Sequence, residues 1–274
     1  MGDIKILRAL PRRQRRMVGP WCFLDRFGPL HFAAEKPMDV APHPHIGLQT
    51  VSWLLEGEII HHDSLGCEAL ARPGQLNLMT AGHGIAHSEE TPKVNSGLLS
   101  GVQLWVALPD LHRDMTPAFD HYPSLPTLDL GDATITLIAG SMFQHTAPAR
   151  TFSPIIGAEI VLHSNQSLVL PLRSDFEHAL FILQGDFALE GHALAGSALH
   201  YLGSNRDELS IAGSANSRLL LIGGEPFKEN IMMWWNFVAR TREEMAQARQ
   251  HWINHERFAE VKGYRGVRLP APEL

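Results

Sequence analysis

The sequence predicts an all-β protein built from sandwich or barrel domains, with one helix near its C-terminus. Short apolar runs are separated by turn-forming residues, the order of these runs recurs in the second half, and persuasive helical periodicity is confined to the end of the chain. The chain has 274 residues, of which 45% are hydrophobic and 19% charged. This length and composition suit two globular domains with apolar cores.

The predicted strands are rich in Val, Ile, Leu, Phe and Trp, and Gly, Pro, Asn or Asp follows each at short intervals. Strands that are this short and this regularly punctuated favour a β-sandwich or barrel over alternating strands and helices. The apolar runs cover residues 50–64, 74–82, 98–109, 133–141, 158–172, 178–191 and 217–226.

A weak internal repeat relates the two halves. The segment SWLLEGEI (52–59) is similar to LFILQGDF (180–187), and RPGQLNLM (72–79) is similar to LAGSALHYL (194–202). In each half a strand leads through a turn centred on glycine into another strand. We infer two copies of one β unit, joined within the segment 140–154, which is rich in Pro, Ser and Thr.

The predicted helix lies in TREEMAQARQHWINHERF (241–258). Thr241 and Glu244 form a capping-box pattern at its start. Met245, Ala248 and Trp252 then follow at helical spacing, so we expect one face of the helix to pack on the body of the protein.

Charge and cysteine content narrow the class of protein. The net charge of -6 and the pI of about 6.2 argue against direct binding to nucleic acid or to a membrane surface. The basic run PRRQRR (11–16) is interpreted as a solvated loop, and no segment is apolar for the length of a membrane span. Cys22 and Cys67 are too few for a disulfide framework, and the N-terminus lacks the apolar core of a signal peptide. We therefore expect a cytoplasmic protein.

The chain has 16 histidines, and two pairs of polar residues that include three of them indicate a metal site. His43 and His45 are two positions apart, as are His87 and Glu89, so the members of each pair share a face if the chain is extended there. Imidazole and carboxylate ligands of this kind suit a divalent transition metal, including Fe(II) used for oxygen chemistry. The alternative is that these histidines only satisfy hydrogen bonds in the core or at the surface.

Long motifs in the N-terminal half are APHPHIGLQTVSWLLEGEIIHHDSLG (41–66), RPGQLNLMTAGHGIAHSEE (72–90) and RMVGPWCFLDRFGP (16–29), and in the C-terminal half SLVLPLRSDFEHALFILQGD (167–186) and LLLIGGEPFKENIMMWWNFVARTREEMAQAR (219–249). They resemble the pirin family of the cupin superfamily, and the resemblance extends over nearly the whole chain. It implies two jelly-roll-type cupin β-barrels in tandem. The expected division is an N-terminal barrel at 1–140 that carries the metal site, and a metal-free C-terminal barrel at 141–274 with the short helix at about 241–258.

The resemblance also implies the ligand set. The metal ligands are expected at His43, His45, His87 and Glu89, holding one divalent transition metal per chain, with Fe(II) the expected ion and other metals left open. Gln49 stands where the general cupin pattern has a glutamate, and His83 stands where many relatives carry arginine. Gln49, His61 and His83 are candidates to orient the ligands by accepting hydrogen bonds from their free ring N–H groups. His178 is interpreted as a structural residue of the second barrel.

The activity implied by the resemblance is that of a quercetin 2,3-dioxygenase, which opens the heterocycle of a flavonol with O2 and releases carbon monoxide. Glu89 is the expected catalytic residue, taking the proton of the 3-hydroxyl group. The expected partners are therefore a small phenolic or flavonol substrate and O2. The substrate of this chain is left open and extends to another phenolic compound or an enediol.

The same ligands also allow a different class of function. The alternative is a redox-sensitive, iron-containing regulatory protein that acts through a protein partner, as a transcription cofactor or a modulator of a metabolic enzyme. The sequence does not decide between catalysis and regulation, and it leaves the metal in the cell and the oligomeric state open.

Overall fold

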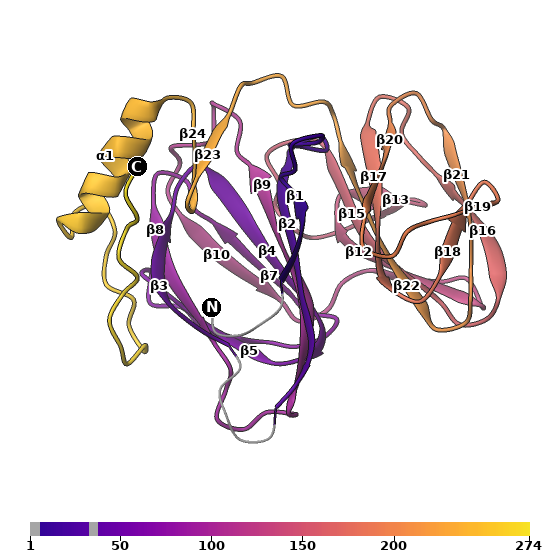
Figure 1. The fold of residues 1–274 in the computed structure, drawn as a ribbon, viewed down its shortest axis with the longest axis horizontal. Coiled ribbons are helices and arrows are strands. Elements are labelled where there is room, and N and C mark those ends of the chain that lie inside the picture. The colour runs from indigo at the N-terminus through magenta and orange to yellow at the C-terminus, as the bar shows by residue number, and fades with distance from the viewer. Residues whose placement is uncertain (1–5, 33–37) are drawn as a thin grey trace. The chain divides into compact units, whose positions relative to one another are not determined.

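The computed structural model, which describes residues 6–32 and 38–274, consists mostly of β-strands with one helix near the C-terminus (Figure 1). The chain folds into two compact units. Among the described residues, unit 1 comprises residues 6, 25–32, 38–123 and 228–274, and unit 2 comprises residues 7–24 and 124–227. The units are thus interleaved along the chain, and the expected division near residue 140 stays a prediction.

Unit 1 contains two sheets. The six-stranded sheet has the order β1-β2-β9-β4-β7-β10, and most of β1 and the first four residues of β2 belong to unit 2 by the division above. The four-stranded sheet has the order β3-β8-β5-β6. The strands are β1 (Ile6–Leu10), β2 (Trp21–His31), β3 (Asp39–His45), β4 (Leu48–Gly57), β5 (Ile59–Asp63), β6 (Glu68–Ala71), β7 (Leu76–Thr80), β8 (Ile85–Glu90), β9 (Leu98–Ala107) and β10 (Ala118–Tyr122).

Unit 2 repeats this arrangement. A six-stranded sheet has the order β11-β12-β15-β22-β17-β20, a four-stranded sheet has the order β16-β21-β18-β19, and β13 pairs with β14. The strands are β11 (Thr127–Asp129), β12 (Ala133–Ala139), β13 (Ser141–Met142), β14 (His145–Thr146), β15 (Ile155–Leu162), β16 (Gln166–Pro171), β17 (Glu177–Gln184), β18 (Phe187–Leu189), β19 (His192–Ala193), β20 (Leu199–Gly203), β21 (Glu208–Gly213) and β22 (Ser217–Gly224).

Each unit has a core between its two sheets. In unit 2 one buried cluster joins Ile160 and Leu219 of the six-stranded sheet to Leu170 of the four-stranded sheet. In unit 1 a cluster joins Leu54 of the larger sheet to Ile59 of the smaller one. Two sheets that bury one face each against the other form the double-layer β architecture that the short apolar runs predict. The all-β prediction is confirmed.

The internal repeat corresponds to a repeated turn between two sheets. Gly57 ends β4 just before β5, and Gly185 lies between β17 and β18. Both glycines have positive φ, 86° and 74°. A Cβ atom at Gly57 would clash with the carbonyl oxygen of Leu98, and one at Gly185 would clash with the Oγ of Ser217. Glycine is therefore required at the same point of each copy.

The C-terminal segment packs on unit 1. Strands β23 (Met232–Trp234) and β24 (Phe237–Ala239) form a hairpin, and helix α1 (Arg242–Ile253) follows. Thr241 caps the helix by accepting a hydrogen bond from the backbone N–H of Glu244, as the capping-box pattern predicts. The helix is shorter than expected at its C-terminal end. Among the described residues, no helix is long and apolar enough to cross a membrane.

The buried face of the helix covers the outer side of the four-stranded sheet of unit 1. Met245, Ala248 and Trp252 are buried, as their helical spacing predicts. They share a cluster with Ala86 of β8 and Phe237 of the hairpin. Because side chains alternate along a strand, Ala86 faces the helix while His87 faces the space between the sheets.

Candidate metal centre

The four-stranded sheet of unit 1 gathers the predicted polar residues on one face. In the β3–β8 pair His43 lies opposite His87, and in the β5–β8 pair Asp63 lies opposite His87 and His61 lies opposite Glu89. Residues two apart on a strand share a face, and so do residues directly opposite each other on paired strands. The register therefore places histidines and carboxylates from three neighbouring strands on the inner face of this sheet.

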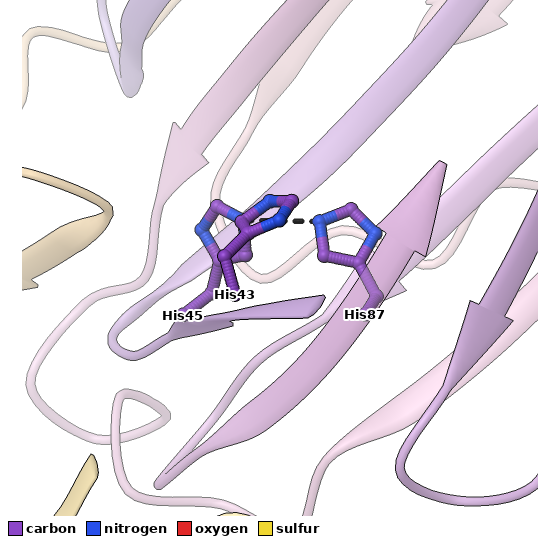
Figure 2. Close-up of side chains that lie close together, drawn as sticks. All are labelled: His43, His45 and His87. Carbon is purple, nitrogen blue, oxygen red and sulfur yellow. Dashed lines mark hydrogen bonds between the residues drawn. The ribbon is translucent and has the colours of Figure 1, made fainter. Parts of the chain in front are cut away.

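His43, His45 and His87 converge (Figure 2). One potential ligand atom from each lies within 4.8 Å of the corresponding atoms of the other two. The side chains are buried, with exposed fractions of 7%, 2% and 1%. Among the described residues, this group of closely spaced ligand atoms contains only the three histidines, and Glu89 lies outside it.

Hydrogen bonds donated by the Nδ1 atoms fix which nitrogen of His43 and His45 is available to bind a metal. His43 Nδ1 lies 2.9 Å from the carbonyl oxygen of Ala41, and His45 Nδ1 lies 3.1 Å from that of Asn236. A carbonyl oxygen only accepts, so both Nδ1 atoms carry the proton and donate. In the neutral rings Nε2 then keeps its lone pair, which is the arrangement found in histidines that bind a metal.

A chain of three side chains fixes His87 in the same way. The carboxylate of Asp63 accepts a hydrogen bond from His61 Nε2 at 3.1 Å, and His61 Nδ1 lies 3.3 Å from His87 Nδ1. Since Nε2 of His61 donates to Asp63, its Nδ1 is placed to accept, and the neutral His87 can donate to it from Nδ1. The lone pair of His87 is left on Nε2, which lies 3.0 Å from His45 Nε2.

Two imidazole lone pairs that face each other at this distance repel, and a cation bound by both would remove the repulsion. Burial lowers the pKa of His43 to about 4 and the pKa values of His45 and His87 well below 6.5. The rings are therefore neutral near pH 7 and offer lone pairs rather than protons. Two nitrogens that bind one ion at about 2.1 Å and at right angles are about 3 Å apart. The donor set thus fits a transition metal ion.

Glu89 lies beside the histidines on β8 and is itself buried. The hydroxyl of Ser52, which belongs to β4 in the facing sheet, donates a hydrogen bond to Glu89 Oε1 at 3.1 Å. Burial raises the pKa of Glu89, although the nearby His61 and the Ser52 hydrogen bond oppose this shift. Glu89 is therefore a carboxylate whose affinity for a proton is increased by its surroundings.

The three residues expected to support the ligands occupy different places. His61 contacts His87 through the hydrogen bond described above. Gln49 lies on β4, where its side-chain amide donates to the hydroxyl of Thr80 at 2.9 Å. His83 is exposed, and its Nδ1 lies 3.1 Å from the carbonyl oxygen of Met115. His61 thus contacts a proposed ligand. The contact of Gln49 joins two strands of the facing sheet, and the contact of His83 joins a turn to the carbonyl oxygen of Met115.

Sequence reasoning missed several residues at the site. Phe119 of β10 stacks on His61 with ring centroids 4.1 Å apart and an angle of 10°, and Trp105 packs edge-on against His45 at 5.4 Å. Asp63 was not among the predicted site residues. It does accept hydrogen bonds from the backbone N–H groups of Leu65 and Cys67, and it binds His61 as well. The two-residue spacing of His61 and Asp63 was the signal that could have revealed this pair.

Comparison with known proteins agrees with this arrangement. The family model for pirin matches residues 3–106, and the model for the pirin C-terminal cupin domain matches residues 157–259. A pirin-like protein of Caulobacter vibrioides is 35% identical over 259 residues, covering 92% of this chain and 89% of the relative. The chain belongs to the pirin family. The two family models match successive parts of the chain, which supports the prediction of two cupin domains.

Solved structures of other pirins have the same fold. A crystal structure described as quercetin 2,3-dioxygenase from Acinetobacter baumannii is 45% identical, with a TM-score of 0.94 over 99% of this chain and 90% of that one. The bacterial pirin YhhW from Escherichia coli, solved in complex with nickel(II), has a TM-score of 0.67 at 16% identity, covering 82% and 93% of the two chains. At that identity the likeness to YhhW concerns the fold.

Proposed function

We propose that this pirin is a metal-dependent dioxygenase of the quercetin 2,3-dioxygenase type, which cleaves the heterocycle of a flavonol with O2 and releases carbon monoxide. The observation that carries the proposal is the convergence of three buried, neutral histidines whose Nδ1 atoms are all committed as donors. The full-length similarity to a protein described as quercetin 2,3-dioxygenase supports it.

In this proposal His43, His45 and His87 hold one transition metal ion, with Glu89 as the fourth ligand. Imidazole ligands suit several divalent ions, and one carboxylate beside them is typical of Fe(II) sites that react with O2. Fe(II) is accordingly the proposed ion. When bound, the metal supplies a Lewis acid and template for the flavonol and a path for electrons to O2.

The residues of the chain supply proton transfer and exclusion of water. Glu89 is the proposed acceptor of the proton from the 3-hydroxyl group, because its buried carboxylate has a raised pKa and a single identified side-chain donor in Ser52. Removal of that proton makes the flavonol easier to oxidise. Phe119, stacked on His61, and Trp105, packed on His45, shield the histidines from solvent.

Asp63 and His61 are proposed as positioning residues. Burial alone would raise the pKa of Asp63, but the hydrogen bonds from His61 and from the backbone N–H groups of Cys67 and Leu65 lower it. The carboxylate is therefore charged near pH 7 and holds His61 with Nδ1 towards His87. This relay keeps the His87 proton on Nδ1, away from the ligand atom.

A cytoplasmic location is part of the proposal. Both cysteines are free thiols, Cys22 buried and Cys67 half-buried. An Fe(II) site and unpaired thiols both suit a reducing compartment.

The test is oxygen-dependent loss of the near-visible absorbance of quercetin by the iron-loaded protein, with carbon monoxide measured in parallel. The proposal predicts turnover under air and none under nitrogen, and loss of turnover in His87→Ala and Glu89→Ala. His192→Ala, which changes an exposed histidine of unit 2, is the matched control and is expected to retain activity. Unchanged quercetin in air with fully metallated protein would contradict the enzyme proposal and favour the regulatory alternative.

A further inference from the structure

Unit 2 contains a cavity of about 250 Å³ that the proposed dioxygenase chemistry does not use. It lies where β16 ends, next to the turn between β13 and β14. Most of its lining is apolar and includes two aromatic rings, and one imidazole borders it. The lining residues that matter here are Met142, Phe143, Ile156, Leu172, Phe176 and His178.

His178 is a buried polar group without a hydrogen bond at Nδ1. Its side chain is 1% exposed, and among the described residues no donor or acceptor pairs with its Nδ1 atom. Phe176 is its neighbouring ring, 6.1 Å between centroids. A buried polar atom without a partner is costly, and in native proteins it is commonly satisfied by a water or a ligand.

The charge around the cavity favours an uncharged occupant. Burial lowers the pKa of His178 to about 4, with the carboxylate of Asp175 opposing the shift, so the ring is neutral near pH 7. Arg173, the cationic residue of the lining, is paired with Asp175, whose Oδ1 accepts from its Nε at 3.0 Å. A neutral imidazole offers one acceptor and one donor, which suits a hydroxyl group.

The size and lining of the cavity favour one aromatic ring. An apolar cavity of about 150 Å³ holds benzene, whereas pockets for larger organic ligands are about 300 Å³ or more. Phe143, which is 37% exposed, can pack against a ring, as aromatic side chains commonly do, whereas Phe176 is buried and has the guanidinium of Arg173 over its ring at 4.2 Å. We propose that this cavity is a binding site for a small, uncharged, single-ring aromatic alcohol, whose hydroxyl group forms a hydrogen bond with His178.

Phenol is the probe for this site, and toluene is the matched probe that lacks the hydroxyl group. Titration calorimetry with the full-length protein is expected to show saturable binding of phenol at one site per chain and binding of toluene about tenfold weaker, as for one lost hydrogen bond. His178→Leu is expected to remove the preference for phenol, whereas His192→Ala is expected to keep it.

A measurement on the unaltered protein separates this site from the metal centre. Long-range ¹H–¹⁵N spectra are expected to show that phenol shifts the ring nitrogen resonances of His178. Shifts confined to His43, His45 and His87 would overturn the proposal, as would equal affinity for phenol and toluene. Since the spectra use the native chain, they decide the question even if His178→Leu does not fold.

Discussion

The four-stranded sheets of the two units have equivalent strand orders, but the side chains on their inner faces differ in polarity. Strands β3 and β8 are the first two strands of one sheet, and β16 and β21 are the first two of the other. His43 lies opposite His87 in unit 1, whereas Leu170 lies opposite Leu209 in unit 2. Both leucines are fully buried in an apolar cluster. One double-sheet framework therefore accommodates either a polar centre or an apolar contact between the paired strands.

Buried histidines have requirements that buried leucines lack. Leucines need only close packing, whereas each imidazole needs a partner for the nitrogen that does not face the centre. In unit 1 these partners are the carbonyl oxygen of Ala41, the ring of His61 and the carbonyl oxygen of Asn236. Asn236 lies in the turn between β23 and β24, so the C-terminal segment contributes an acceptor to the site as well as a cover.

The largest effect is expected from His87→Ala. His87 contacts both His45 and His61, so its removal takes away one ligand and disconnects the supporting pair. Elemental analysis after anaerobic loading with Fe(II) should find about one ion per native chain and less than about a tenth of that in the variant. His192→Ala should load as the native chain does. Full iron content in His87→Ala would contradict the proposed ligand set.

The apolar half of the comparison is tested by Leu209→Ala. The side chain is fully buried against Leu170, so its truncation should lower the free energy of unfolding by about 2–5 kcal/mol in urea titrations. Val169→Ala on β16 is the control, because that side chain is 54% exposed and its loss should cost less than about 0.5 kcal/mol. Similar effects of the two substitutions would refute the closed core between the sheets of unit 2.

The positioning role is tested by Asp63→Asn. An amide can still accept from the backbone N–H groups of Leu65 and Cys67, but it loses the charge that holds His61. Affinity for Fe(II) or Ni(II), measured by competition with a chelator, should fall about 10–100-fold. Glu68→Gln removes a different carboxylate that pairs with a neighbouring histidine, His62, and should leave the affinity unchanged. Equal affinities in all three proteins would exclude the relay.

A smaller effect concerns acid stability in unit 2. The pKa of His178 is about 4 in the folded protein, below its ordinary value of 6.5. The unfolded chain therefore binds the proton more readily, so the contribution of neutral His178 to stability is complete above pH 6.5 and is lost as the pH falls towards 4. The free energy of unfolding, measured at pH 7 and at pH 5, should fall less between these pH values in His178→Leu than in the native chain. An identical loss would mean that His178 does not contribute.

The sequence predicts the features that depend on local periodicity. Alternation along a strand placed His43 and His45 on one face and His87 and Glu89 on one face, and helical spacing identified the buried side of α1. Thr241 was correctly identified as its cap. These properties depend on residues a few positions apart, so they can be predicted without knowledge of the tertiary structure.

Features that depend on strand pairing could not be predicted. The run 50–64 is two strands in different sheets, because the turn at Gly57 moves the chain from β4 to β5. That turn brings His61 and Asp63 beside β8, and only the register of β5 with β8 sets Asp63 opposite His87. The acceptor from Asn236 and the stacking of Phe119 likewise come from residues distant in the sequence.

The convergence of the three histidines on one ion is tested most directly by anomalous diffraction at the iron edge from crystals loaded with Fe(II). We predict one peak in unit 1, bound by the Nε2 atoms of His43, His45 and His87 at about 2.1 Å. A peak bound through Nδ1, a peak elsewhere in the chain, or no peak after loading would contradict the account.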